Sequence, residues 1–316
     1  MMFMSRLLDR LVLIAFFIII GTLGMKAGAQ ELIVATGNLK TGTYSQMFTE
    51  LNRYCQPSTI GIMIKQQQTA GSPENVQLLL NNKVNAAIVQ SDLLFFSKAN
   101  NTRNINNVKT LFGLYPEELH FIARADVKKE GGWGMGKLKF GQTSVSYNSL
   151  GDLKGRPVGA VGGSVLSARL VSQLAGLDLD VREYPNNEAL QKALLDGEVD
   201  SILVVAGAPS TLVSQLPKSF RLLPVGQDTQ ARVKDVYQPT VVGYDNLGQA
   251  GVPTVSTQAL FVTRTYESAG MKSTLAKLRS CMKKNLPELK DATGTHAKWQ
   301  DVQANDDGKW PVYELP

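Results

Sequence analysis

The stretch from Val34 to Asp92 decides the fold of this 316-residue chain. Four short segments in it turn from apolar to small polar residues: Val-Ala-Thr-Gly at 34–37, Gly-Thr-Tyr at 42–44, Ala-Gly-Ser-Pro-Glu-Asn at 70–75 and Ala-Ala-Ile-Val-Gln-Ser-Asp at 86–92. Such breaks expose backbone N–H groups and hydroxyls at one edge of a sheet, where α/β proteins hold small polar ligands. The stretch therefore predicts a ligand-binding edge.

Apolar runs and helical patterns alternate through this stretch and beyond it. Strands are predicted at 32–35, 60–64 and 85–89, with helices at 44–54 and 73–82. The pattern restarts after about residue 119, with strands at 119–123, 157–161, 181–184 and 200–205 and helices at 165–175 and 187–196. A strand at 260–263 and a long amphipathic helix at 268–285 follow. This order predicts an α/β fold with two lobes, each a parallel sheet covered by helices.

One insertion interrupts the second α/β pattern, between Lys128 and Asn148. Glycines at 131, 132, 134 and 136 precede Lys-Leu-Lys-Phe at 137–140. The alternation after the glycines predicts a surface β-hairpin, and a flexible loop is an equal alternative.

The first 29 residues are typical of an export signal. Arg6 and Arg10 precede an almost unbroken apolar run at 11–20, and Ala-Gly-Ala at 27–29 forms a small-residue cleavage site before Gln30. The run is short for a membrane span, which favours secretion, and an uncleaved N-terminal anchor is the alternative. The signal carries three basic residues and one acidic residue, so its removal lowers the net charge from +6 to +4.

The charges and cysteines of the mature chain exclude some function classes. Lysines and arginines are scattered without a basic, aromatic-interleaved run, so no nucleic-acid partner is predicted. Cys55 and Cys281 form one disulfide between an early and a late helix, or they are two buried thiols. No Cys-x-x-Cys or His-Glu-x-x-His occurs, and His120 and His296 are far apart in sequence, so no metal site is predicted.

Catalytic signatures are missing as well. Gly37 and Gly42 have the glycine spacing of a phosphate loop, but Thr-Tyr stands where Lys-Ser/Thr is needed. No Gly-x-Ser-x-Gly occurs, and the Ser-x-x-Lys at 280–283 lies inside the predicted late helix. The sequence therefore predicts no enzyme and no cofactor.

The ligand-binding interpretation depends on helix starts and strand ends. A helix N-terminus after the turn at 37–44 has free N–H groups that suit a small anion, and Thr43 as an ordinary N-cap is the alternative. Ser72 is predicted to be an N-cap, and Ser91 or Asp92 would either line a crevice or cap the next helix. Small residues recur at 163–164 and 207–209. Two such sets facing each other would form a cleft.

At these residues the chain resembles the TAXI-type solute receptors of TRAP transporters. The matching segments are Ala-Thr-Gly at 35–37, Gly-Thr-Tyr at 42–44, Gly-Ser-Pro-Glu-Asn at 71–75, Val-Gln-Ser-Asp at 89–92, Leu-Gly-Asp-Leu-Lys-Gly-Arg at 150–156, Gly-Ser at 163–164, Leu-Asp-Gly-Glu-Val-Asp at 195–200 and Gly-Ala-Pro at 207–209. They occur in the family's order between about residues 32 and 265.

The resemblance implies a two-lobed type II periplasmic binding protein fold with a cleft that closes on its ligand. The first lobe would comprise residues 30–118 and 260–316, and the second lobe residues 119–259. It further implies a monomer in the periplasm that carries a small anionic or zwitterionic solute, a carboxylate or an amino acid, to membrane permease subunits. Main-chain amides at 42–44 and 163–164 would hold the anionic end. Carried over by motif, the cleft residues would be Thr43, Tyr44, Gln90, Ser91, Asp92, Gly163, Ser164 and Gly207.

The chain departs from the family's pattern at two places. Asn-Leu-Lys-Thr at 38–41 replaces a shorter, glycine-rich stretch, and Lys40 either adds a charge to the site or points to solvent. The 128–148 insertion is longer than the family leads us to expect. Two other functions are kept beside the receptor: a sensor or scaffold of the same fold with an envelope protein partner, and a secreted hydrolase.

Overall fold

A mixed sheet runs through the structured part of the chain. The computed structural model describes residues 31–40, 42–125, 127–133 and 140–316, and the predicted export signal lies outside them. Along the main path of the sheet the described strands follow the order β2 (Met63–Gln68), β1 (Glu31–Gly37), β3 (Ala86–Gln90), β12 (Gln249–Arg264), β4 (Val108–Arg124), β9 (Ser201–Ala206), β7 (Pro157–Ala160) and β8 (Asp180–Glu183). Two further strands extend it, because β10 (Phe220–Leu222) pairs with β4 and β11 (Gln238–Tyr244) pairs with β12.

The predicted parallel pairing is confirmed at both ends of the sheet but not in its middle. Val34 aligns with Ala86 in the parallel pair of β1 and β3, and β7 is parallel to both β8 and β9. In contrast, β12 is antiparallel to β3 and β4, and β4 is antiparallel to β9. Two antiparallel strands therefore join the two parallel parts.

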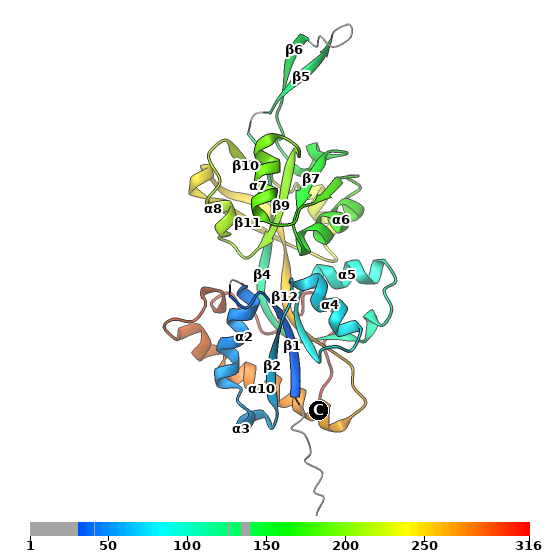
Figure 1. Cartoon of the computed structure of the whole chain (residues 1–316), viewed down its shortest axis with the longest axis vertical. Coiled ribbons are helices and arrows are strands. Elements are labelled where there is room, and N and C mark those ends of the chain that lie inside the picture. The colour runs from blue at the N-terminus through cyan, green and yellow to red at the C-terminus, as the bar shows by residue number, and fades with distance from the viewer. Residues whose placement is uncertain (1–30, 41, 126, 134–139) are drawn as a thin grey trace, which may run out of the picture. The chain divides into compact units, whose positions relative to one another are not determined.

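These two joining strands are much longer than the sequence predicts. β4 has 17 residues and β12 has 16, and they pair from Glu118 opposite Ser256 to Val108 opposite Arg264. Figure 1 shows both strands running through the two groups of helices. The predicted lobe boundaries, at 118/119 and 259/260, fall inside these strands and remain a proposal.

Helices cover the sheet in both predicted lobes. The first lobe contains α2 (Thr43–Tyr54), α3 (Pro57–Ile60), α4 (Ser72–Leu80), α5 (Ser91–Ala99) and α10 (Ala269–Asp291), and the second contains α6 (Gly163–Ala175), α7 (Asn187–Asp196), α8 (Thr211–Ser214) and α9 (Gln227–Val233). Short 3-10 turns lie at Ile105–Asn107, Leu150–Leu153, Asp245–Leu247 and Ala297–Trp299. The strand predicted at 60–64 begins only at Met63, because Pro57 starts a short helix that ends at a left-handed glycine, Gly61.

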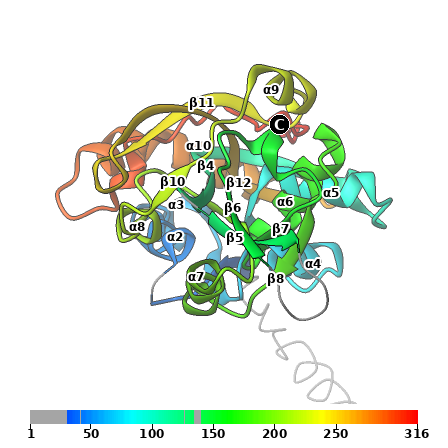
Figure 2. The ribbon, with the colours of Figure 1, turned by 90° about the horizontal axis from the view of Figure 1, so that it is seen from above.

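Alternating side chains of β9 show how the second lobe is layered. Ile202 packs into a core cluster with Leu190 and Leu194 of α7, while its neighbour Leu203 packs with Ala168 of α6. Because successive side chains of a strand point to opposite faces, α6 and α7 cover opposite sides of β9, as Figures 1 and 2 show.

The buried apolar residues form four clusters. The clusters around Phe48 and Val89 are built from residues up to 115 and from 259 onward. The clusters around Phe121 and Ile202 are built from residues 119–255. The buried members of the clusters therefore fall into two groups of residues, and Phe95 and Phe96 of α5 also pack against the cluster around Phe121.

The insertion folds as a separate hairpin. β5 (Val127–Trp133) and β6 (Phe140–Val145) pair antiparallel in a two-stranded sheet of their own (Figure 1). The hairpin alternative is thus confirmed for the described backbone, although its first strand includes the glycines at 131 and 132 that were expected to precede it.

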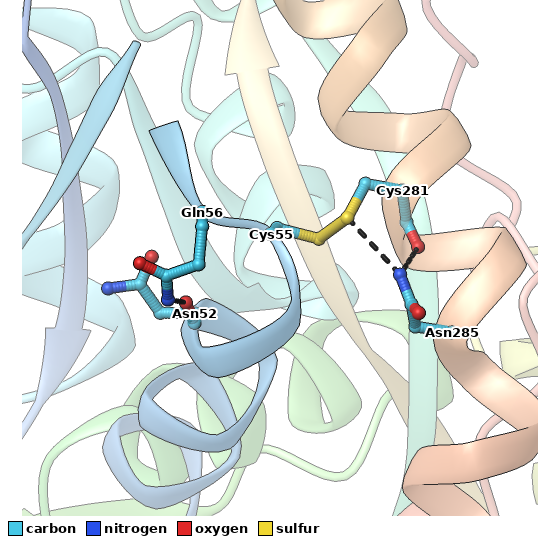
Figure 3. The surroundings of a disulfide bond; sticks show 5 residues. All are labelled: Asn52, Cys55, Gln56, Cys281 and Asn285. Carbon is cyan, nitrogen blue, oxygen red and sulfur yellow. Dashed lines mark hydrogen bonds between the residues drawn. A yellow bond between two sulfur atoms is a disulfide. The ribbon is translucent and has the colours of Figure 1, made fainter. Parts of the chain in front are cut away.

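A disulfide joins the end of α2 to the middle of α10. Cys55 Sγ and Cys281 Sγ are bonded, with their Cα atoms 5.9 Å apart, and Asn285 Nδ2 donates a hydrogen bond to the carbonyl oxygen of Cys281 (Figure 3). No helix in the described ranges is both long and apolar enough to cross a membrane.

Candidate ligand-binding site

The eight predicted cleft residues lie at helix starts and strand ends, as the sequence indicates. Thr43 and Tyr44 begin α2, Gln90 ends β3, and Ser91 and Asp92 begin α5. On the second lobe, Gly163 and Ser164 begin α6, and Gly207 follows β9. What their side chains contact differs from the expectations.

The N-cap interpretations of these helix starts are wrong. The caps of α2, α4 and α5 are Gly42, Gly71 and Gln90, and none of the three makes a side-chain cap. The hydroxyls hold distant segments instead. Ser72 Oγ accepts from the Gln90 amide at 3.2 Å, and Ser91 Oγ lies 2.9 Å from Thr257 Oγ1 of β12.

Tyr44 is hydrogen-bonded to a buried acid on the crossing strand β4. Its hydroxyl donates to Glu117 Oε2 at 2.6 Å, and its ring lies 6.3 Å from that of Tyr115 between centroids. Thr43 in turn hydrogen-bonds Tyr115. Two tyrosines and a carboxyl group therefore surround one side of the predicted cleft.

The pKa of the Glu117 carboxyl group is strongly raised. Burial raises the pKa from 4.5 to about 8, the hydrogen bond from Tyr44 opposes that change, and the charges of Asp92 and Glu118 reinforce it. The charge of Lys298 also opposes the rise, but burial outweighs it, so the carboxyl group carries its proton at neutral pH. A positive ligand group at this position would favour the ionised form.

The turn after β9 is held by hydrogen bonds to two side chains. The Ala208 amide donates to Glu118 Oε2 at 2.6 Å, and the Ala208 carbonyl accepts from Lys298 Nζ, also at 2.6 Å. Gly207 leaves room for the lysine, because a Cβ on it would lie 2.4 Å from Lys298 Cε. A cavity of about 400 Å³ opens beside this turn, lined in part by Glu118, Lys298 and Asp301.

Gln90 reaches from the first lobe to the start of α6. A Cβ on Gly163 would lie 2.2 Å from Gln90 Oε1, so only glycine permits this approach. The Gln90 side chain is nearly buried, at 6% exposure of the residue, and Nε2 has no hydrogen-bond partner among the described residues. A buried amide donor thus points at the junction between the lobes.

Asp92 and Ser91 are buried below this junction. Asp92 Oδ2 accepts from Ser167 Oγ of α6 at 2.6 Å and from the Tyr237 hydroxyl at 2.9 Å, both in the second lobe. Burial raises the pKa of Asp92, against these hydrogen bonds. Asp92 therefore links the two lobes through hydrogen bonds. Neither Ser91 nor Asp92 has exposed surface that a solute could contact.

Several backbone groups predicted to hold an anion are already engaged. The Gly42 amide donates to the Asn38 carbonyl at 2.9 Å, and the Ser164 amide donates to the Val161 carbonyl at 3.2 Å. Ser164 Oγ accepts from the Val205 amide of β9 at 3.1 Å. Lys40 is exposed.

Four important residues, Tyr115, Glu117, Glu118 and Lys298, were missed by sequence reasoning. A signal existed for the two acids, because Pro-Glu-Glu at 116–118 interrupts an apolar run. Nothing local marks Lys298, whose partner is 90 positions away.

The described residues offer no assembled hydrolytic site around His120. Its Nδ1 lies 3.1 Å from the Val204 carbonyl and its Nε2 lies 2.8 Å from the Tyr244 hydroxyl, while burial lowers its pKa to about 4. The ring is therefore neutral and tied to structural partners. Among the residues that the structure describes, no group of three acidic, histidine or cysteine side chains could hold a metal ion.

A comparison with protein-family models decides the family. The model described as the NMT1-like family matches residues 34–311. The chain belongs to the NMT1-like family. This match covers both lobes of the NMT1-like chain, whereas the closer resemblance to TAXI-type receptors stays a prediction.

Solved structures similar to this NMT1-like protein include proteins of related architecture. An amino acid ABC transporter substrate-binding protein from Streptococcus pneumoniae bound to L-arginine is 13% identical with a TM-score of 0.48, covering 90% of this chain and 97% of that one. The GluR0 ligand-binding core from Nostoc punctiforme with L-glutamate is 17% identical, with a TM-score of 0.44 and coverages of 85% and 95%. A Xanthomonas citri protein bound to ATP is 11% identical, with a TM-score of 0.49 and coverages of 87% and 90%. The predicted α/β fold is confirmed by the mixed sheet and the helices of the chain itself.

Proposed function

We propose that this NMT1-like protein is an exported, monomeric receptor of the TAXI type. In the periplasm it captures an amino-acid-like solute in the cleft between its lobes and presents it to TRAP-type permease subunits. It performs no covalent chemistry. The sequence motifs, the two crossing strands and the family membership support this proposal.

One observation carries the proposal: Glu117 is a buried carboxyl group at the point where the lobes meet. It lies on β4, receives the Tyr44 hydroxyl from the first lobe, and is followed by Glu118, which holds the turn at Ala208 of the second lobe. Burying an acid is unfavourable, and the charge of Lys298 offsets only part of that cost at Glu117. A bound ammonium group would replace the proton that Glu117 otherwise retains.

The remaining contacts suggest how the solute is oriented. Gln90 Nε2 is a buried donor without a partner beside Gly163, at the N-terminal end of the 13-residue helix α6. An amide donor and a helix N-terminus both favour a carboxylate. We therefore favour a zwitterionic amino acid over a dicarboxylate, with its ammonium at Glu117 and its carboxylate at Gln90.

The alternatives have less support. A secreted hydrolase would need a general base, and His120 is neutral, buried and bonded to Val204 and Tyr244. A sensor with an envelope protein partner would use the same site, and the absence of a permease gene beside this one would favour it.

A melting-shift screen of amino acids and dicarboxylates tests the proposal. A solute that binds only the folded state adds about 2.7 kcal/mol of stability at a hundredfold excess over Kd. We expect at least one amino acid to stabilise the native protein and to lose most of its effect on Glu117→Gln. Glu183→Gln, on the exposed strand β8, is the matched control. A screen with no stabilising solute would count against the receptor.

A further inference from the structure

The segment that follows α10 is anchored on the first lobe. Trp299 is buried and its Nε1 donates to Glu50 Oε2 at 2.6 Å. Farther on, the Thr110 amide donates to the Pro311 carbonyl and the Tyr313 amide donates to the Thr110 carbonyl, each at 2.9 Å. The segment thus pairs with the start of the crossing strand β4.

Between these anchors the segment lies directly on the crossing strands. A Cβ on Gly113 of β4 would lie 2.1 Å from the Asp306 carbonyl oxygen. A Cβ on Gly308 would lie 2.8 Å from Ser91 Cβ and 3.0 Å from Gln258 Cβ. Any bending of these strands must therefore disturb residues 303–308.

Two lysines of this segment reach the second lobe at separate places. Lys298 Nζ donates to the Ala208 carbonyl at 2.6 Å. Lys309 Nζ donates to the Tyr237 carbonyl at 2.7 Å and also to that of Lys234. Between them, Gln238 Nε2 donates to Asp306 Oδ2 at 3.2 Å.

Each lysine is held in place by its surroundings. The Lys298 side chain is only 12% exposed, pairs with Asp301 Oδ2 at 2.7 Å and lies 5.9 Å from the centroid of the Tyr115 ring. Lys309 has a φ of 60° and follows Gly308 at 58°. Residues other than glycine, asparagine and aspartate rarely adopt this left-handed conformation, so the backbone at Lys309 is unusual for its residue type.

We propose that residues 298–309 form a strap that limits the opening of the cleft, with Lys298 and Lys309 as its two contacts with the second lobe. The strap is attached to the first lobe through buried side chains and backbone pairing, and to the second lobe through lysine-to-carbonyl bonds. Opening of the cleft breaks these bonds and exposes the two ammonium groups to water. The contacts of the strap do not depend on the proposed function, and only its effect on solute entry rests on that function.

The test measures the distance between the lobes in the solute-free protein. Both native cysteines are in the disulfide, so spin labels can be attached at Lys83→Cys in the first lobe and Glu188→Cys in the second, both exposed sites. The distance distribution is then compared for Lys298→Met, Lys309→Met and the double variant. Lys192→Met removes an exposed lysine that pairs within α7 and is the matched control.

We expect the double variant to shift the distribution to longer distances, each single variant to shift it less, and Lys192→Met to match the native protein. Gly207→Ala is a second route to the same result, because its methyl group would displace Lys298 Cε without removing the charge. If the double variant melts cooperatively and keeps the native distribution of distances between the two labels, the proposal is overturned. Because no solute is added, that result is separate from failure of the ligand screen.

Discussion

The Tyr44 hydroxyl donates a 2.6 Å hydrogen bond to Glu117 Oε2, which joins the start of α2 to the crossing strand β4. This bond favours the ionised carboxylate, yet burial outweighs it and the pKa of Glu117 rises to about 8. At neutral pH the Glu117 carboxyl group therefore keeps a proton, and a cationic ligand group that binds beside it can displace this proton. Two consequences can be measured.

Solute binding should release a proton. If the ammonium of an amino acid pairs with Glu117, the carboxyl group must ionise, so complex formation releases close to one proton well below pH 8 and fewer above it. Calorimetry of the same binding reaction in buffers with different ionisation enthalpies gives the proton count. Glu117→Gln should remove the release, and an unchanged count in that variant would assign the proton to another group.

The unfolding free energy should fall as the pH rises from about 6.5 to 8. A raised acid pKa means that the folded state binds more protons than the unfolded state between 4.5 and about 8, so stability declines with pH there. His120 has the opposite effect, since its lowered pKa of about 4 makes stability rise between 4 and 6.5. Urea denaturation across this range should show the decline above 6.5, and Glu117→Gln should flatten it. If the unfolding free energy of the native protein does not change between pH 6.5 and 8, the raised pKa of Glu117 is contradicted.

The disulfide should contribute substantially to stability. It closes a loop of 226 residues between α2 and α10, and it restricts the unfolded chain. Replacing both Cys55 and Cys281 with serine should lower the unfolding free energy by about 2–5 kcal/mol, as measured in urea. Asn285→Ala removes a hydrogen bond to Cys281 but keeps the covalent bond, so it should lose far less. Equal losses in the two variants would contradict this view.

Asp92 should matter for folding more than for solute binding. Asp92→Ala leaves the hydroxyls of Ser167 and Tyr237 without their acceptor inside the protein, which should cost about 2–5 kcal/mol. Asp92→Asn keeps an oxygen acceptor of the same size and should cost less. Chemical denaturation checks the order, with the exposed Asp228→Ala as control. If alanine and asparagine destabilise equally, the hydrogen bonds are not the cause.

The sequence predicted most of the elements whose apolar pattern is local. Helix α7 was predicted with its exact bounds because Asn186 caps it and Gly197 ends it in a left-handed conformation. The crossing strands were predicted only in part, because buried polar residues such as Glu117, Thr257 and Gln258 interrupt their apolar pattern. The side chains of these residues form hydrogen bonds with partners that are far away in the sequence. The strap lysines bind backbone carbonyls, which no side-chain pattern can reveal.

Gly113 should be essential for seating the C-terminal segment. Alanine there would place its methyl group 2.1 Å from the Asp306 carbonyl oxygen and 2.6 Å from that of Gln303, and backbone atoms cannot turn aside as a flexible side chain can. We expect Gly113→Ala to lower the unfolding free energy by about 1–3 kcal/mol, the usual cost of overpacking, and to displace residues 303–306.

Gly226→Ala is the matched control, because its φ of −65° suits any residue and no atom lies within 4 Å of the added Cβ. Hydrogen exchange of the Gly113 amide, which donates to the Ala304 carbonyl at 3.4 Å in the native protein, reports the displacement directly. Similar stability and exchange in the two variants would show that the segment is not packed on β4 as closely as the structure has it.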